Sequence, residues 1–330
     1  MKKVMNAAVD YVDEMLDGLC AAHDRYFQQP ERRVIVRQGG AIKGKVGIVT
    51  GGGSGHLPVF TGYIGPGLLD ACAIGDVFAS PSSDQMASAM RHAHGGAGVL
   101  RLYGNYGGDI MNFDMAGEML EMEDIASTTV LLADDVASAP PAEAKKRRGV
   151  AGMVYAFKIA GARADERASL DEVTRTAQKA ADACRSIGFA LTPCIVPQAG
   201  KPTFELKDDE MEMGMGIHGE PGIWRAKLKP ADPVADEMLD RLVADFGLGK
   251  GERVSVLVNS LGATPLEELY ILYRRVGRRL AELGVTIVAP LVGRYATSME
   301  MTGATLTICR LDGELERLLK APCDCPYWKS

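Results

Sequence analysis

Short apolar segments alternate with helical patterns along most of the sequence, and this alternation constrains the fold more than any other feature. The expected elements of the first half are strands near residues 46–50, 71–74, 98–102 and 128–133, with helices at 83–93 and in a segment ending near Lys158. Strands that alternate with helices are typical of a parallel sheet covered on both faces. The first half is therefore predicted to be an α/β unit.

The second half repeats this logic. Its expected elements are strands at 253–259, 285–290 and 305–311 and a helix that ends at Gly284. Thr264 and Glu267 have the spacing of a capping box, with Pro265 at the first helical position. A second α/β unit is therefore expected.

Two more helices are expected outside these units. About the first twenty-five residues carry apolar side chains at helical spacing. A long helix is predicted from the capping box of Ser169 and Glu172 to Gly188, where a glycine would end it. The proline-containing stretch 191–202 then breaks the helical pattern, which suggests a crossover into a second lobe.

The sequence thus predicts two lobes, residues 1–188 and 189–330, each with a mixed or mostly parallel sheet covered by helices. Each lobe contains one histidine that is framed by glycines. His56 closes the run GGGSGH directly after an expected strand, and His218 lies in the run GMGIHGEPG. Glycine allows a ligand to approach the main chain closely, and histidine suits nucleophilic and proton-transfer chemistry near neutral pH. A small-ligand site between the lobes is the expectation.

Nucleotide-binding fingerprints are not found. The glycine run before His56 lacks the third glycine of the dinucleotide motif, because His56 or Pro58 occupies that place. The Gly-Lys pairs at 44–45 and 249–250 are not followed by Ser or Thr, as a phosphate-binding loop requires. Nucleotide binding of either common type is not predicted.

Composition narrows the class of protein further. The 330 residues are 47% hydrophobic and 24% charged, which is typical of a globular protein, and the net charge of −6 argues against nucleic acid or an anionic membrane as partner. The seven scattered cysteines do not suggest a disulfide framework, and Cys323 and Cys325 lack further ligands at zinc spacing. No apolar run is long enough to span a membrane. A cytoplasmic protein without a metal site is expected.

Long motifs in a fixed order point to a family. The chain resembles the substrate-binding K subunit of bacterial dihydroxyacetone kinases over nearly its whole length. The motifs that carry the resemblance are Gly51–His56 with Pro58, Gly62–Gly65, Gly75–Pro81, Asn105–Phe113, Arg148–Ala151, Pro197–Pro202, Met211–Gly222 and Leu261–Pro265.

The resemblance implies a chemical role for three residues. In this family the histidine that corresponds to His218 forms a covalent hemiaminal with the carbonyl carbon of the ketose. Covalent capture would fix the terminal hydroxyl for attack and exclude glycerol, which has no carbonyl. Asp109 would accept the proton of that hydroxyl, and His56 would hydrogen-bond the substrate and assist. Gly53, Ser54 and Gly55 would contact the oxygens of the substrate.

Two positions depart from the family pattern. Gly104 stands where the family commonly has a lysine that contacts substrate, and Leu57 replaces the usual glutamate after the GGGSGH run. Gly104 is expected to leave free volume in the substrate site. A four-carbon ketose such as erythrulose, or a branched one such as apulose, is therefore expected to be accepted at least as well as dihydroxyacetone.

The resemblance also implies partners. A K subunit binds no nucleotide, and the chain ends at Ser330 with no room for the helical nucleotide-binding domain of fused kinases. A separate L-type subunit would hold ATP, or ADP with Mg²⁺ that a phosphotransferase-system protein recharges. A homodimer is expected, since most oligomers are symmetric.

Two other readings are open. One is a non-catalytic, ketose-sensing paralogue that regulates transcription through a partner; retention of both Asp109 and His56 favours the enzyme. The other is a nicotinamide oxidoreductase, which rests only on the α/β pattern and is disfavoured by the failed dinucleotide motif.

Overall fold

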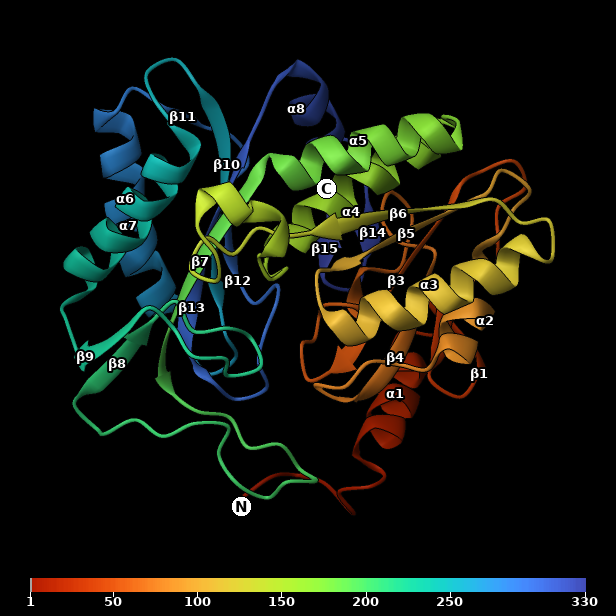
Figure 1. The fold of residues 1–330 in the computed structure, drawn as a ribbon, viewed down its shortest axis with the longest axis horizontal. Coiled ribbons are helices and arrows are strands. Elements are labelled where there is room, and N and C mark those ends of the chain that lie inside the picture. The colour runs from red at the N-terminus through yellow and green to blue at the C-terminus, as the bar shows by residue number, and fades with distance from the viewer. Residues whose placement is uncertain (1) are drawn as a thin grey trace.

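The computed structural model describes residues 2–330, which form two large β-sheets with helices between and around them (Figure 1). The helices are α1 (Tyr11–Ala22), α2 (Ser83–Ala93), α3 (Gly107–Glu121), α4 (Gly152–Asp165), α5 (Leu170–Asp182), α6 (Ala231–Phe246), α7 (Leu266–Glu282) and α8 (Gly313–Leu319), with 3₁₀ turns η1 (Thr61–Tyr63) and η2 (Pro141–Lys146).

The first sheet, on the right in Figure 1, has the strand order β1-β2-β4-β3-β5-β6. Its strands are β1 (Phe27–Glu31), β2 (Val34–Arg37), β3 (Gly47–Ser54), β4 (Ala71–Val77), β5 (Val99–Gly104) and β6 (Ser127–Leu132). The last four pair in parallel, while β1 and β2 add an antiparallel edge. The carboxyl ends of parallel strands meet at one edge, so the loops that follow β3, β4 and β5 are brought together.

The second sheet is mixed and lies on the left in Figure 1. Its strands are β7 (Cys184–Thr192), β8 (Glu210–Met213), β9 (Trp224–Lys227), β10 (Arg253–Ser260), β11 (Thr286–Ile287), β12 (Leu291–Gly293) and β13 (Thr302–Arg310). Only β11 and β12 run parallel to β10, and the other neighbours are antiparallel. A small hairpin, β14 (Asp324–Cys325) and β15 (Trp328–Lys329), ends the chain. The predicted fold, α/β with mixed or mostly parallel sheets covered by helices, is confirmed.

Helix α4 fills the space between the two sheets. Twelve of its fourteen residues are buried, as expected for a helix that is apolar on all sides. Its close approach requires Gly161, because a Cβ there would lie 2.5 Å from the backbone of Gly67 and Leu68. The largest apolar cluster therefore joins both sheets into one core, with members such as Ile48 and Leu257.

Three local predictions are wrong. The helix that begins at the capping box of Ser169 ends at Asp182 rather than Gly188, because the apolar residues that follow pair with β13 as strand β7. Thr264 does not cap α7; its hydroxyl donates to the carbonyl of Gly303, and Pro265 is the N-cap. The strand expected at 285–290 shrinks to β11. In the first two cases a contact with a distant segment overrode a local signal.

Most other expected elements lie within a few residues of their predicted bounds, but the first helix covers only Tyr11–Ala22, and the helix expected to end near Lys158 continues to Asp165. The capping box of Ser169 and Glu172 is confirmed, with both reciprocal hydrogen bonds present. The division into lobes at residue 188 stays a prediction; the strand that opens the second sheet begins at Cys184. None of the helices in residues 2–330 is long and apolar enough to cross a membrane.

Candidate active site

His56 lies in the loop after β3 and is almost fully buried, with 1% of its surface exposed. Its Nδ1 lies 2.7 Å from the carbonyl oxygen of Thr297, which can only accept, so Nδ1 carries a proton. The ring of Phe78 stacks on His56 with centroids 5.0 Å apart. Burial, and to a smaller extent the charge of His218, lowers the pKa of His56 to about 3. The imidazole is therefore neutral, with its Nε2 lone pair free.

The glycines before His56 are required by the residues around them. A Cβ on Gly53 would lie 2.7 Å from the backbone of Phe78, and Gly55 has a φ of +103° that side chains rarely adopt. The loop can therefore lie directly against the segment that follows β4. This contact places Phe78 under His56.

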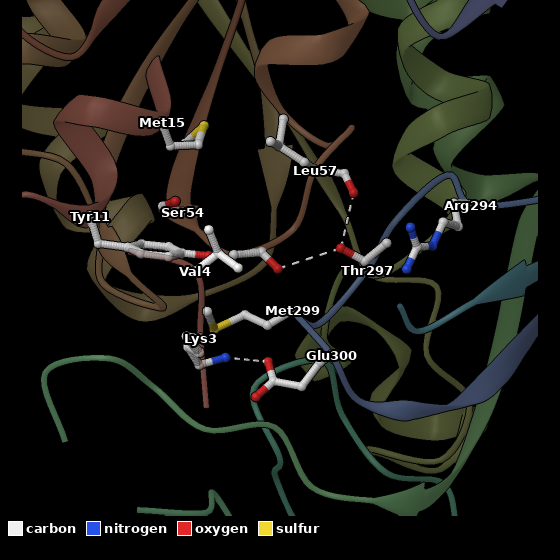
Figure 2. Close-up of a pocket in the computed structure, with 11 residues that line it drawn as sticks. Lys3, Val4, Tyr11, Met15, Ser54, Leu57, Arg294, Thr297, Met299 and Glu300 are labelled. Atoms are coloured by element: carbon white, nitrogen blue, oxygen red, sulfur yellow. Dashed lines mark hydrogen bonds and ion pairs between the residues drawn. The ribbon is translucent and has the colours of Figure 1, made fainter. Parts of the chain in front are cut away.

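A cavity of about 330 Å³ adjoins the loop through Ser54, Gly55 and Leu57 (Figure 2). The hydroxyl of Thr297 crosses to the loop and donates to the carbonyl of Leu57 at 2.9 Å, as the dashed line shows. The peptide N–H of Met299 also donates to the carbonyl of Gly55. The segment 297–299 thus holds the loop of His56 by its main chain.

His218 comes from the hairpin that joins β8 to β9 in the second sheet. Its side chain is 23% exposed, and its Nε2 lies 3.1 Å from Nε2 of His56. Its Nδ1 lies 2.9 Å from Oε1 of Glu220, and its peptide N–H donates to Oε2 of the same carboxylate. The fold therefore joins the two glycine-framed histidines, although 162 residues separate them in the sequence.

The contact between the two Nε2 atoms determines the proton count of the pair. Each Nδ1 donates to a group that only accepts, Thr297 carbonyl for His56 and the Glu220 carboxylate for His218. Two neutral rings would then point lone pairs at each other, so one additional proton must lie between them. The contact between the two rings therefore requires a proton on one of the two Nε2 atoms.

Asp109 lies in the first turn of α3 and is 7% exposed. The hydroxyl of Ser80 donates a short hydrogen bond to its Oδ1. Burial raises the pKa of Asp109 to about 6, while the Ser80 hydrogen bond and the charge of His218 act in the opposite direction. The carboxylate is thus a poised base near neutral pH, within electrostatic reach of His218.

Gly104 does not leave the free volume that the sequence suggested. It ends β5, and a Cβ there would lie 3.1 Å from Cε2 of Tyr106. The Tyr106 ring fills this space and points its edge at His218, with centroids 4.8 Å apart. The open space is therefore limited at the Cβ position, and the expected acceptance of a longer ketose stays a prediction.

A family model described as a Dak1 domain matches residues 17–327. The chain belongs to the Dak1 family. It is 46% identical to the dihydroxyacetone-binding subunit DhaK of a PTS-dependent dihydroxyacetone kinase from Listeria innocua, over 100% of this chain and 99% of that protein. It is 42% identical to an L-erythrulose 1-kinase from Mycolicibacterium smegmatis over its whole length, but spans only 58% of that kinase.

Solved structures agree with the Dak1 assignment. The dihydroxyacetone kinase operon co-activator Dha-DhaQ superposes with a TM-score of 0.89 at 33% identity, covering 96% of this chain and 98% of that one. The dihydroxyacetone kinase of C. freundii also gives a TM-score of 0.89, at 32% identity, covering all of this chain and 60% of that one. The predicted resemblance to the K subunits is confirmed.

The sequence analysis did not single out several residues of this Dak1 site, although most of them lie in motifs that it quoted. Phe78, Ser80 and Tyr106 lie within the quoted motifs 75–81 and 105–113, and Glu220 lies two residues after His218. Position inside a long motif was the available signal. Their contacts with His56, Asp109 and His218 could be assigned only in three dimensions.

Proposed function

We propose that this chain is the ketose-binding subunit of a dihydroxyacetone-type kinase, which captures the ketose on His218 and presents its terminal hydroxyl for phosphorylation. The observation that carries the proposal is the contact of 3.1 Å between Nε2 of His218 and Nε2 of His56, with the ionisable Asp109 nearby. A nucleophile, an acid and a base thus converge from two sheets.

The proton held between the histidines serves the capture step. As the carbonyl enters, this proton passes to Nε2 of His56, which frees the Nε2 lone pair of His218. The lone pair bonds to the carbonyl carbon, the C=O π electrons move to oxygen, and oxygen takes the proton from His56. The product is a neutral hydroxyl on a hemiaminal, with an imidazolium whose Nδ1–H remains on the Glu220 carboxylate.

Asp109 acts in the second step. Its carboxylate accepts the proton of the terminal hydroxyl as the hydroxyl oxygen attacks the phosphorus. Phosphoryl transfer depends on in-line positioning and charge stabilisation more than on covalent bonding of the protein to the phosphoryl group. A covalent bond at the carbonyl therefore helps by holding the terminal hydroxyl of the ketose in position. The backbone of Gly53 and Gly55 and the hydroxyl of Ser54 are proposed to contact the oxygens of the ketose.

The phosphoryl donor is proposed to come from a separate L-type subunit that holds ATP, or ADP with Mg²⁺ recharged by a phosphotransferase-system protein. The absence of nucleotide-binding fingerprints in the sequence supports this division, and two relatives are named PTS-dependent and PEP-dependent kinases. A homodimer is part of the proposal, and light scattering that finds a species of 35.3 kDa at micromolar concentration would contradict it.

The proposed substrate is dihydroxyacetone or a four-carbon ketose. Relatives 41–42% identical are named erythrulose kinases, and dihydroxyacetone-binding subunits reach 46%. Acceptance of a longer or branched ketose such as apulose stays a prediction, because the contact with Tyr106 limits the space only at the Cβ position of residue 104. Comparing kcat/KM for dihydroxyacetone, erythrulose and apulose with one L-type partner decides the order.

Capture is tested with a ketose labelled with ¹³C at its carbonyl carbon. In the wild-type protein the carbonyl resonance is expected to move to the range of a tetrahedral carbon. A resonance that stays ketonic at saturating protein would overturn covalent capture.

A ketose-sensing regulator is the second candidate, because the co-activator Dha-DhaQ has nearly the same fold at 33% identity. A sensor needs capture but no general base. The buried carboxylate of Asp109, with its pKa raised to about 6 and its Ser80 partner in place, favours the kinase. Adduct formation without any turnover in the presence of an L-type subunit would favour the sensor.

A further inference from the structure

We propose that Arg148 is a positioning residue for capture, which fixes the Glu220 carboxylate and, through it, the orientation and tautomer of His218. The inference deepens the proposed function, since it concerns the histidine that captures the ketose. The motif around Arg148 was noted in the sequence, but no role follows for it from the capture chemistry alone.

Arg148 is anchored on the first sheet. Its Nε lies 2.9 Å and its Nη2 2.7 Å from Oδ2 of Asp135, which follows β6 and is almost fully buried. Asp135 is itself held, because its Oδ1 accepts from the peptide N–H of Ala137 and its own N–H donates to the carbonyl of Arg148. Two nitrogens of the guanidinium thus converge on one carboxylate oxygen, which restrains its orientation.

The free side of the guanidinium faces the hairpin of His218. Nη2 donates to the carbonyl of Gly214 at 3.1 Å, and Nη1 lies 3.9 Å from Oε2 of Glu220. Gly216 makes room for this approach, since a Cβ there would collide with both the Arg148 guanidinium and the Glu220 carboxylate. Arg148 therefore links the carboxyl edge of the first sheet to the hairpin of the second.

Glu220 connects Arg148 to His218. Both oxygens of its carboxylate are engaged by His218, one by the ring and one by the peptide N–H. Although burial acts to raise it, the hydrogen bond and charge of His218 and the charge of Arg148 lower the pKa of Glu220 to about 2. An ionised Glu220 keeps the proton on Nδ1 of His218 and turns Nε2 toward His56 and the ketose.

Tyr106, another neighbour of His218, does not replace the connection through Arg148 and Glu220. The ring of Tyr106 contacts His218 edge-on from the first lobe and can restrain tilt, but it makes no hydrogen bond to either ring nitrogen among the described residues. Removing the Arg148 guanidinium takes away the cation beside Oε2 of Glu220 and the link from the hairpin to Asp135. The expected result is a mixture of His218 orientations and tautomers.

The test uses the whole chain and compares variants of Arg148 with the wild type. Arg148→Gln is expected to reduce the adduct-forming fraction of a carbonyl-labelled ketose at least about tenfold. Arg148→Lys is expected to keep part of the adduct, because lysine keeps the positive charge but lacks the planar N–H donors of the guanidinium. ¹⁵N spectra of the histidine rings report directly which nitrogens carry protons. Nδ1 of His218 should be fully protonated in the wild type and only partly protonated in Arg148→Gln.

Arg147→Gln is the matched control. Arg147 belongs to the same loop and is buried in a pair with Asp245, but it does not contact Glu220. Its variant is expected to lose stability while the folded protein keeps wild-type capture. If Arg147→Gln lowers capture as much as Arg148→Gln does, the effect belongs to the loop and the proposal is wrong.

A double-mutant cycle with Glu220→Gln separates action through Glu220 from a general structural effect. If Arg148 acts through Glu220, the double variant should capture no worse than Glu220→Gln alone. Additive losses, or an unchanged His218 tautomer in Arg148→Gln, would overturn the proposal. Failure of the wild type to form any adduct would instead overturn the proposed function, and the tautomer measurement would still decide the role of Arg148.

Discussion

The two histidines of the site occupy contrasting environments. His56 is buried among Phe78 and the main chain of Thr297, and its neighbours keep it neutral. His218 lies on a hairpin, is 23% exposed, and faces an ionised carboxylate. The first environment keeps its ring neutral, and the second places a carboxylate against Nδ1 of its ring. The difference teaches how neighbouring groups give two identical side chains different roles in one site.

The largest expected effect comes from removing the exposed member of this pair. His218→Ala should abolish the covalent adduct completely, because the variant lacks the nucleophilic nitrogen that lies 3.1 Å from Nε2 of His56. The ¹³C resonance of the labelled carbonyl measures this. The matched control is His23→Ala, a histidine on the far end of α1 that contacts Phe27 and Tyr327. An adduct that persists in His218→Ala would show that a residue other than His218 captures the ketose.

Asp109→Asn tests whether capture and transfer are separate tasks. The amide keeps the shape of the side chain but cannot take the hydroxyl proton, so kcat should fall about 10²- to 10⁴-fold. Ketose capture should remain largely intact. Turnover with an L-type subunit, measured beside the adduct fraction, checks both halves; a variant within a few-fold of wild-type turnover would make Asp109 a binding residue only.

Ser80→Ala should change the pH dependence more than the maximal rate. Asp109 must be ionised to act as base, so kcat is expected to fall as pH drops through about 6. The Ser80 hydrogen bond lowers the pKa of Asp109, and its loss should move this acidic limb to higher pH. A kcat profile with Ser82→Ala as control, a serine that caps α2, measures the shift. An acidic limb that moves to lower pH would contradict the base assignment.

The smallest effect is expected far from both histidines. Ser169→Ala removes the N-cap of α5 and should cost about 1 kcal/mol in the free energy of unfolding. Denaturant unfolding measures the loss, and capture should stay at the wild-type level. A fall in capture would show that the site depends on global stability. Losses of capture in the histidine variants could then not be assigned to the environments of His56 and His218.

Much of the secondary structure and the candidate site residues could be predicted from sequence, because they depend on residues that are close together in the chain. The parallel strands that end near His56 and Gly104 are apolar runs followed by glycine, and such runs form strands wherever helices can cover them. The cap at Ser169 depends on residues three apart in the chain. The long motifs then located His56, Asp109 and His218 as candidates.

Other features depended on distant segments and could not be predicted. Residues 184–192 form a strand only because β13 offers its edge, and Thr264 turns to Gly303 rather than capping its own helix. Tyr106 fills the space above Gly104, which no spacing rule indicates. Each outcome reflects a long-range contact whose energy exceeds the local preference.

The sequence by itself determined the alternating elements, the glycines that allow close backbone approach, and the identity of the reactive side chains. Only the tertiary structure decided which protonation state each side chain has. The pKa of about 3 for His56 and of about 6 for Asp109 arises chiefly from burial, and the Glu220 carboxylate that faces Nδ1 of His218 is ionised beside His218 and Arg148. Burial and charge neighbours are properties of the packed chain, because desolvation requires residues that the sequence keeps far apart.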